Sequence, residues 1–265
     1  MSAEKDISLD EKRVYEGDQR ETTVYVASGV GVVAVNVVDE RVGGFELVAR
    51  CTARDVAADE GAVAVATDED VLVGPESFDG TGFGSAVAVD LSADGLLAAD
   101  DDGRVARYED GEWRALGTCA GAVRAIDGDL VAADDGVYRA TDDGLTHAGL
   151  DDVRDVATAG IPRAATAAGL YHLGNGWMDD ADGDFTLVAS DGDRGHAVGD
   201  GDLYRLTDDG WEVHPNQPDA TFVGVTYGDT TYAVGSDGRF FAEAPDGWRH
   251  QLLGMPDVVA VAGPR

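Results

Sequence analysis

Long apolar runs, cysteine and lysine are all scarce in this 265-residue sequence. No run approaches the roughly 18 apolar residues that a membrane-spanning helix needs, so we expect no transmembrane segment. The polar first twenty residues hold no apolar core of a secretory signal, and we expect a cytoplasmic protein. The two cysteines, Cys51 and Cys119, stand at equivalent points of non-adjacent repeats, so we expect free thiols rather than a disulfide.

Positive charge is also scarce. Lysine and arginine together number 19 against 52 aspartates and glutamates, which gives a formal net charge of −33, and Lys5 and Lys12 are the only lysines. Such an excess opposes the compact state at low salt and is screened at molar salt, where the Debye length falls to roughly 3 Å. We interpret it as adaptation to the cytosol of a halophile, with most acidic clusters solvated. Binding to nucleic acid is disfavoured, because phosphate contacts need a basic surface.

Helical periodicity is missing as well. Apolar runs of four to six residues, rich in Val and Ala, alternate with Asp-Gly, Gly-Asp or Asn-Gly turns, a pattern typical of strands and hairpins. The pattern recurs at a spacing of roughly 31 to 37 residues, which is typical of repeat architectures. The opening strands of the repeats are expected at Arg54–Ala58, Ala86–Val89, Val123–Ile126, Arg154–Ala157, Thr186–Ala189, Phe222–Val225 and Val258–Val261.

Four short strands per repeat match the blade of a β-propeller. The last opening strand, Asp257–Ala262, has no blade after it, whereas Thr23–Ala27 and Val32–Val37 have no opening strand before them. Pairing the two ends would remove the last open sheet edge. The sequence therefore predicts an all-β fold: one domain over residues 21–265, a seven-bladed propeller closed by its C-terminal strand. We expect the polar residues 1–20 before it to form a disordered or loosely docked tail. Six blades are the alternative.

The repeat, the acidity and the closing strand resemble the uncharacterised seven-bladed propeller family of halophilic archaea, a resemblance that implies the fold and no particular activity. The stretch Asp142-x-Gly144-x-Thr146-His147 also resembles the Asp-box of sialidase-type propellers, and Asp208-x-Gly210 keeps part of it. His147 replaces the usual Trp, and Ala140 the usual Ser. In that family the box is a structural turn between the third and fourth strands, so the resemblance implies no catalytic role.

Arginine recurs at one position of three opening strands, at Arg54, Arg124 and Arg154. In a propeller these strands begin at one mouth of the central channel, where three guanidiniums could bind a carboxylate or a phosphate. The alternative is structural pairing between blades, since Asp55 and Asp155 directly follow two of the arginines. The five histidines (His147, His172, His196, His214 and His250) show no ligand spacing. We therefore expect no metal, no cofactor and no catalytic residue.

The fifth repeat departs most from its siblings, because Ala167-Ala168-Gly169 replaces their acidic turn. Its candidate interface residues are Pro162, Arg163, His172, Trp177 and Met178. A less acidic patch edged by Trp, Met and Arg suits a protein contact. The alternative is drift of one repeat, with Trp177 packed between blades like the other tryptophans.

These observations favour a monomeric, non-enzymatic binding or scaffold protein with a protein partner. The alternative is a propeller that binds or hydrolyses an anionic small molecule or glycan at the arginine mouth. Fold analogy alone does not separate the two functions.

Overall fold

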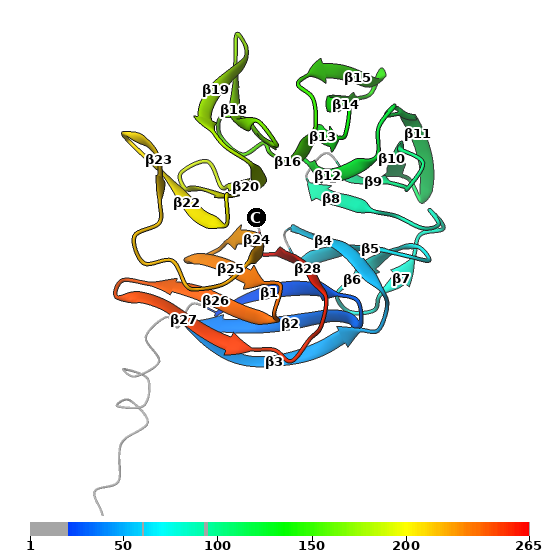
Figure 1. The fold of residues 1–265 in the computed structure, drawn as a ribbon. Coiled ribbons are helices and arrows are strands. Elements are labelled where there is room, and N and C mark those ends of the chain that lie inside the picture. Colours follow the sequence, from blue (N-terminus) through cyan, green and yellow to red (C-terminus); the bar gives the residue numbers. More distant parts are fainter. Residues whose placement is uncertain (1–20, 60, 93–94, 265) are drawn as a thin grey trace, which may run out of the picture.

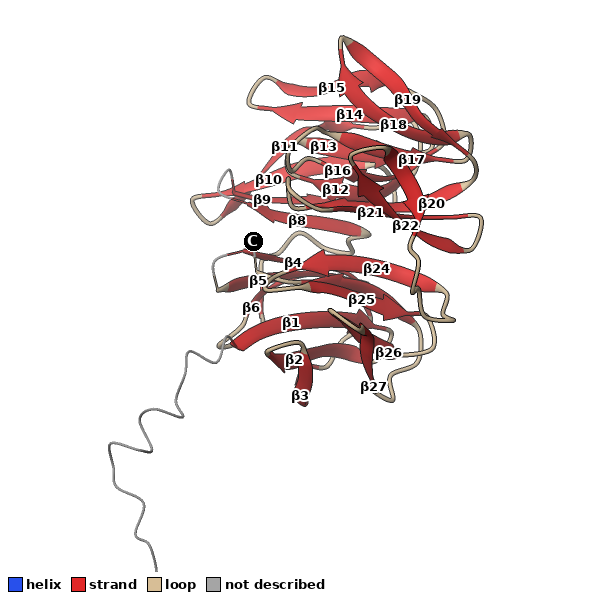
Figure 2. Cartoon of the chain, turned by 90° about the vertical axis from the view of Figure 1, so that its left-hand side faces the viewer, coloured by secondary structure: helices blue, strands red, loops and turns tan. Residues whose placement is uncertain are grey.

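The computed structural model describes residues 21–59, 61–92 and 95–264, and these form seven four-stranded sheets around a central axis (Figure 1). Seen from the side, the described part of the chain consists of strands and connecting loops (Figure 2). Within it, no helix has the length and apolar character needed to cross a membrane. The expected tail at residues 1–20 lies outside the described residues.

We number the blades from the N-terminus. Blade 1 contains β1 (Glu21–Ser28), β2 (Gly31–Val38), β3 (Arg41–Ala49) and β28 (Val258–Ala262). Blade 2 contains β4 (Ala53–Asp59), β5 (Ala62–Thr67), β6 (Val71–Gly74) and β7 (Asp79–Gly80). Blade 3 contains β8 (Ala88–Ser92), β9 (Gly95–Ala99), β10 (Arg104–Glu109) and β11 (Glu112–Thr118). Blade 4 contains β12 (Val123–Asp127), β13 (Leu130–Ala133), β14 (Gly136–Thr141) and β15 (Gly144–Gly149).

Blade 5 contains β16 (Val153–Ala157), β17 (Arg163–Thr166), β18 (Gly169–Gly174) and β19 (Gly176–Asp182). Blade 6 contains β20 (Phe185–Ser190), β21 (Gly195–Gly199), β22 (Asp202–Thr207) and β23 (Gly210–Val213). Blade 7 contains β24 (Phe222–Tyr227), β25 (Thr231–Gly235), β26 (Arg239–Ala244) and β27 (Gly247–Leu252). The turn that resembles an Asp-box joins β14 to β15, the third and fourth strands of blade 4.

The closing strand β28 pairs antiparallel with β1, so blade 1 has the strand order β28-β1-β2-β3. Its register places Tyr25 opposite Ala262 and Ala27 opposite Ala260. The two ends of the chain thus complete one blade. This confirms the predicted closure and the count of seven blades.

The hydrophobic core lies between blades. One cluster combines Val33 and Val35 of blade 1 with Tyr232 and Phe240 of blade 7, all nearly inaccessible to solvent. The second strands of the blades are buried on both faces, which explains why they are continuous apolar runs such as Leu130–Ala133 rather than alternating ones. Each blade therefore depends on its neighbours for burial of its faces.

Both cysteines are free thiols, as expected. Cys119 is buried in the cluster between blades 3 and 4, and burial raises the pKa of its thiol to about 12. Such a thiol stays protonated and is a poor nucleophile.

Candidate functional site

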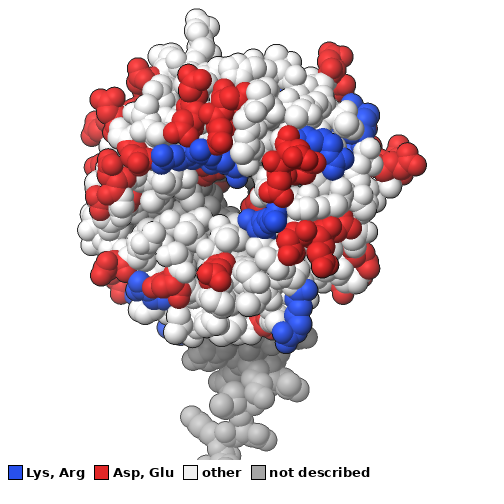
Figure 3. Space-filling view, turned by 45° about the vertical axis from the view of Figure 1, so that its right-hand side comes forward, with Lys and Arg blue, Asp and Glu red and all other residues white. Residues whose placement is uncertain are grey.

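The inner strands β4, β8, β12, β16, β20, β24 and β28 line a central channel with a volume of about 560 Å³. Each of these strands is the innermost of its blade, so equivalent residues lie at similar depth. Figure 3 shows the hollow near the centre of one face, with basic and acidic groups side by side at its edge. A channel of this size can accommodate a side chain or a small ligand.

Arg54, Arg124 and Arg154 all line this channel, near the starts of β4, β12 and β16. Their side chains are between 25% and 35% exposed. The fold therefore places the three arginines at equivalent points of the channel lining, as the sequence predicted. They are equivalent because the three strands have the same register within their blades.

Each guanidinium at this mouth is held by an acid of its own blade or the next. The pairs are Arg54 with Asp101 (2.9 Å), Arg124 with Asp134 (2.5 Å) and Asp152 (2.9 Å), and Arg154 with Asp184. We call Asp101, Asp134, Asp152 and Asp184 the rim carboxylates. Their side chains are 46% to 63% exposed, more than those of the arginines, so the rim presents oxygen atoms to solvent.

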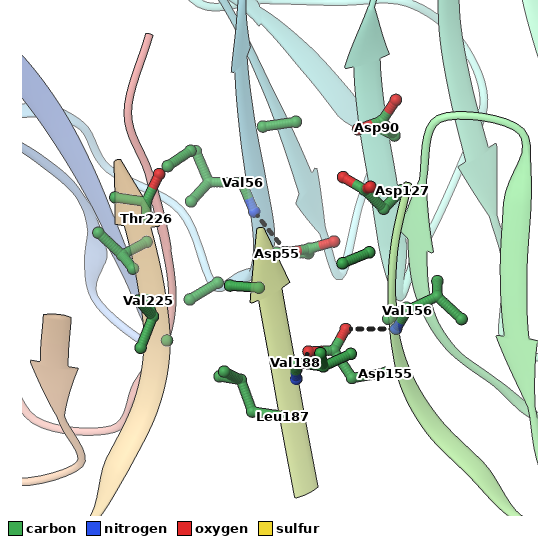
Figure 4. A pocket seen from close by; sticks show the side chains of 18 of the residues that line it. Asp55, Val56, Asp90, Asp127, Asp155, Val156, Leu187, Val188, Val225 and Thr226 are labelled. Atoms are coloured by element: carbon green, nitrogen blue, oxygen red, sulfur yellow. Dashed lines mark hydrogen bonds between the residues drawn. The ribbon is translucent and has the colours of Figure 1, made fainter. Parts of the chain in front are cut away.

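Four further carboxylates lie deeper, in the channel wall (Figure 4): Asp55, Asp90, Asp127 and Asp155. Two of them connect adjacent inner strands by accepting backbone N–H groups. Asp155 accepts from Val156 of its own strand and from Val188 of the next blade, both at 2.9 Å. Asp55 accepts in the same way from Val56 (2.8 Å) and Val89 (2.9 Å). We call these four the wall carboxylates.

The wall carboxylates Asp90 and Asp127 reach the following blade at a different point. Asp90 accepts the N–H of Gly128 at 3.1 Å, and Asp127 accepts the hydroxyl of Thr158 at 2.6 Å. The sequence signal that could have found both is an acid directly after an expected opening strand, since Asp90 follows Ala86–Val89 and Asp127 follows Val123–Ile126. These bonds fix the carboxylates in position before any ligand arrives.

The electrostatics of the wall are dominated by negative charge. Burial raises the pKa of Asp155 to about 8; the carboxylates of Asp127 and Asp55 also raise it, whereas the two N–H donors lower it. Towards the other end of the channel, Arg194 pairs with Asp191 (2.7 Å) and therefore adds no net charge there. A cationic group is favoured in this channel over an anionic one.

Three of the five fifth-blade candidates already have partners, and two of them, Arg163 and Trp177, reach a neighbouring blade. Arg163 is 8% exposed, its Nε lies 3.6 Å from an Asp180 oxygen, and its guanidinium lies over the Trp211 ring of blade 6. His172 contacts the other Asp180 oxygen at 2.6 Å. Trp177 donates its indole N–H to the carbonyl of Ala148 in blade 4 at 2.9 Å.

The remaining two candidates differ in exposure. Pro162 is half-buried, whereas the Met178 side chain is 49% exposed on β19, beside the exposed Asp179. Of the five candidates, Met178 is therefore the most exposed and the most accessible to a partner.

A cluster that sequence spacing did not indicate lies between blades 6 and 7. His196, His214 and Glu243 bring donor atoms within 4.8 Å of one another. They come from β21, the segment after β23, and β26, so their proximity depends on which blade faces meet. The sequence alone does not show which blade faces pack together, so it could not have revealed this cluster.

No curated protein matches the chain at a significant level. Among solved structures, the computationally designed Ika8 protein aligns with a TM-score of 0.60 and 13% identity over 92% of this chain and 91% of its own. AztD from Citrobacter koseri aligns with a TM-score of 0.54 and 9% identity, over 91% of this chain and 83% of its own.

A third similar structure is the extracellular domain of the putative hybrid two-component system BT4673 from B. thetaiotaomicron. It aligns with a TM-score of 0.53 and 12% identity, over 87% of this chain and 38% of its own. These distant similarities show the fold alone. A model of the HVO_0234-like beta-propeller family matches residues 8–263, so the chain belongs to that family.

Proposed function

We propose that this protein is a non-enzymatic binding protein of a halophile's cytosol, and that it holds a basic segment of a protein partner at the arginine mouth of its channel. The observation that carries the proposal is the charge balance there. Four rim carboxylates pair with three guanidiniums, and the wall carboxylates Asp55, Asp90 and Asp127 lie deeper in the same channel. Asp155 is left out of this balance, because burial raises its pKa to about 8. A lysine or arginine side chain that enters the channel would meet carboxylates held in place by hydrogen bonds, at little cost in reorganisation.

A short-range site of this kind suits molar salt. Attraction between distant surface charges is screened beyond roughly 3 Å at 1 M salt, so the acidic surface as a whole would add little affinity. Direct hydrogen-bonded ion pairs inside a channel are screened less. The rim is therefore the part of this surface best able to recognise a cationic group.

The second candidate function is binding or hydrolysis of an anionic small molecule or glycan at the same mouth. It is favoured by the shared position of Arg54, Arg124 and Arg154 in the channel lining. An anion would have to displace the acids already paired with these arginines, and it would approach the negative wall. We therefore rank it below the cationic partner.

The experiment is a pull-down in about 2 M KCl, where nonspecific attraction is screened. Three baits are compared: the native protein, a rim variant with Asp101, Asp134, Asp152 and Asp184 changed to Asn, and a charge-matched control. The control carries the same substitution at the exposed acids Asp143, Asp179, Asp208 and Asp209. We expect a stoichiometric partner on the native and control baits and its loss on the rim variant.

A partner retained equally by the rim variant would contradict the proposal. Absence of any partner, together with a higher melting temperature of the native protein in citrate or phosphate, would favour the anion-binding alternative.

A further inference from the structure

The cluster of His196, His214 and Glu243 is enclosed on the imidazole side and open on the carboxylate side. Both histidines are 5% exposed, and the Glu243 side chain is 32% exposed. An ion could therefore reach the cluster past Glu243 and would then be shielded from bulk water by the two blades. Metal sites with three protein ligands are arranged in this way: the ligands are enclosed, and one side stays open for the fourth coordination position.

The hydrogen bonds around His196 determine which of its nitrogens carries a proton. The Tyr227 hydroxyl donates to the Ala189 carbonyl at 3.0 Å, so its oxygen accepts the Nδ1–H of His196 at 3.0 Å. The lone pair is then on Nε2. Metal-ligating histidines in proteins usually donate their second ring N–H in this way, which fixes the tautomer and the ring orientation.

His214 and Glu243 already stand at near-ligand separation. The Nε2 of His214 lies 3.0 Å from a carboxylate oxygen of Glu243, and without an ion the ring donates its proton to that oxygen. An ion with bonds of about 2.0–2.1 Å to both atoms would replace this proton, which moves by way of solvent to Nδ1 of the same ring, so the imidazole stays neutral and no proton is released overall. The Asn216 N–H, which approaches Nδ1 of His214 at 3.4 Å, would give way to the proton on Nδ1.

We propose that His196, His214 and Glu243 bind one divalent first-row transition-metal ion of the class of Zn²⁺, and that the ion connects blade 6 to blade 7. Two imidazole nitrogens and one carboxylate oxygen suit such ions and do not suit Mg²⁺ or Ca²⁺, which take oxygen ligands. The fourth coordination position faces the open side at Glu243.

The test uses tag-free, chelator-treated full-length protein, titrated with Zn²⁺ by calorimetry in excess Mg²⁺, which occupies oxygen-only surface sites. We expect one high-affinity equivalent per chain and a rise in melting temperature. Co²⁺ should give visible absorption bands typical of tetrahedral or five-coordinate nitrogen and oxygen ligation.

The matched variants separate metal binding from folding. Glu243→Gln keeps an acceptor for the His214 Nε2–H, so it should melt like the native protein without metal while its Zn²⁺ affinity falls at least tenfold. His196→Gln and His214→Gln should lose the high-affinity equivalent. His250→Gln, at an exposed residue of β27 outside the cluster, should keep it. Failure to bind Zn²⁺ in excess Mg²⁺, or equal binding by native protein and all three cluster variants, would overturn the proposal.

Discussion

The substitution Asp155→Asn tests whether the channel wall carries a costly negative charge. A carboxyl whose pKa is raised on folding contributes stability that is fully present below its unfolded value and is lost as the pH rises through its folded value. For Asp155 these values are 3.8 and about 8. We therefore expect the asparagine variant to be more stable than the native protein at pH 8 and to lose this advantage as the pH falls towards 4.

The size of the effect follows from the contacts of the carboxyl. A pKa change from 3.8 to about 8 corresponds to about 5–6 kcal/mol in a closed interior. Asp155 is only half-buried, and its side chain faces a channel that water can enter. We therefore reduce the expected free-energy cost of its charge to about 2–3 kcal/mol. The amide of Asn offers one oxygen to Val156 and Val188, and losing one hydrogen bond costs about 1 kcal/mol. The net gain at pH 8 is then about 1–2 kcal/mol.

The assay is urea unfolding in about 2 M KCl at pH 8, 6 and 4, with the free energy of unfolding compared between variant and native protein. Asp143→Asn, at an exposed acid, is the control for loss of one acidic side chain, and the Asp155 variant is compared with it at each pH. A difference for Asp155→Asn that stays constant across this range would refute the reasoning, as would a variant whose relative stability is greater at pH 4 than at pH 8.

Four further outcomes are expected. The melting temperature of the native protein should rise steeply between about 0.1 and 2 M KCl, and a flat dependence would contradict the halophilic interpretation. Deletion of the chain from Val258 onward should cause aggregation or a large loss of thermal stability, because it uncovers the edge of β1; a variant that melts like the full-length protein would argue against closure. Arg154→Gln should cost about 1 kcal/mol by denaturant unfolding if pairing with Asp184 is its role, whereas unchanged stability with loss of anion binding would favour a pocket. Trp177→Ala should destabilise the fold by about 2 kcal/mol or more, whereas Met178→Ser should cost less than about 0.5 kcal/mol; if the fifth blade is the interface, the Met178 variant alone should weaken the partner complex.

The architecture could be predicted from the sequence because its signals are local and repeated. Each blade carries its own acidic turns, and an unpaired opening strand at Val258–Val261 has one complementary edge, at Thr23–Ala27. The common location of the three channel arginines could be predicted for the same reason, since residues at the same position of each repeat lie at the same depth in the ring.

Contacts between particular blades could not be predicted in this way. Arg163 was expected at the edge of an exposed patch, yet it is buried because Asp180 and the Trp211 ring of the next blade surround it. His196 and Glu243 meet for a similar reason, on facing surfaces of two blades. The sequence indicates which residues face a neighbouring blade, but not the partner atoms that they find there.

The closing strand also bears on how the chain folds. Every other strand pairing within a blade joins neighbours along the chain, whereas Tyr25 and Ala262 meet across nearly the whole described sequence. Each doubling of a closed loop costs about 0.6 kcal/mol of chain entropy, so this pairing carries a penalty of about 2 kcal/mol beyond that of closing a single repeat. During synthesis the first blade emerges without its inner strand, which becomes available only when Val258–Ala262 leave the ribosome. Ring closure is thus the late, non-local step of folding, and until it occurs β1 offers an open template to other nascent chains.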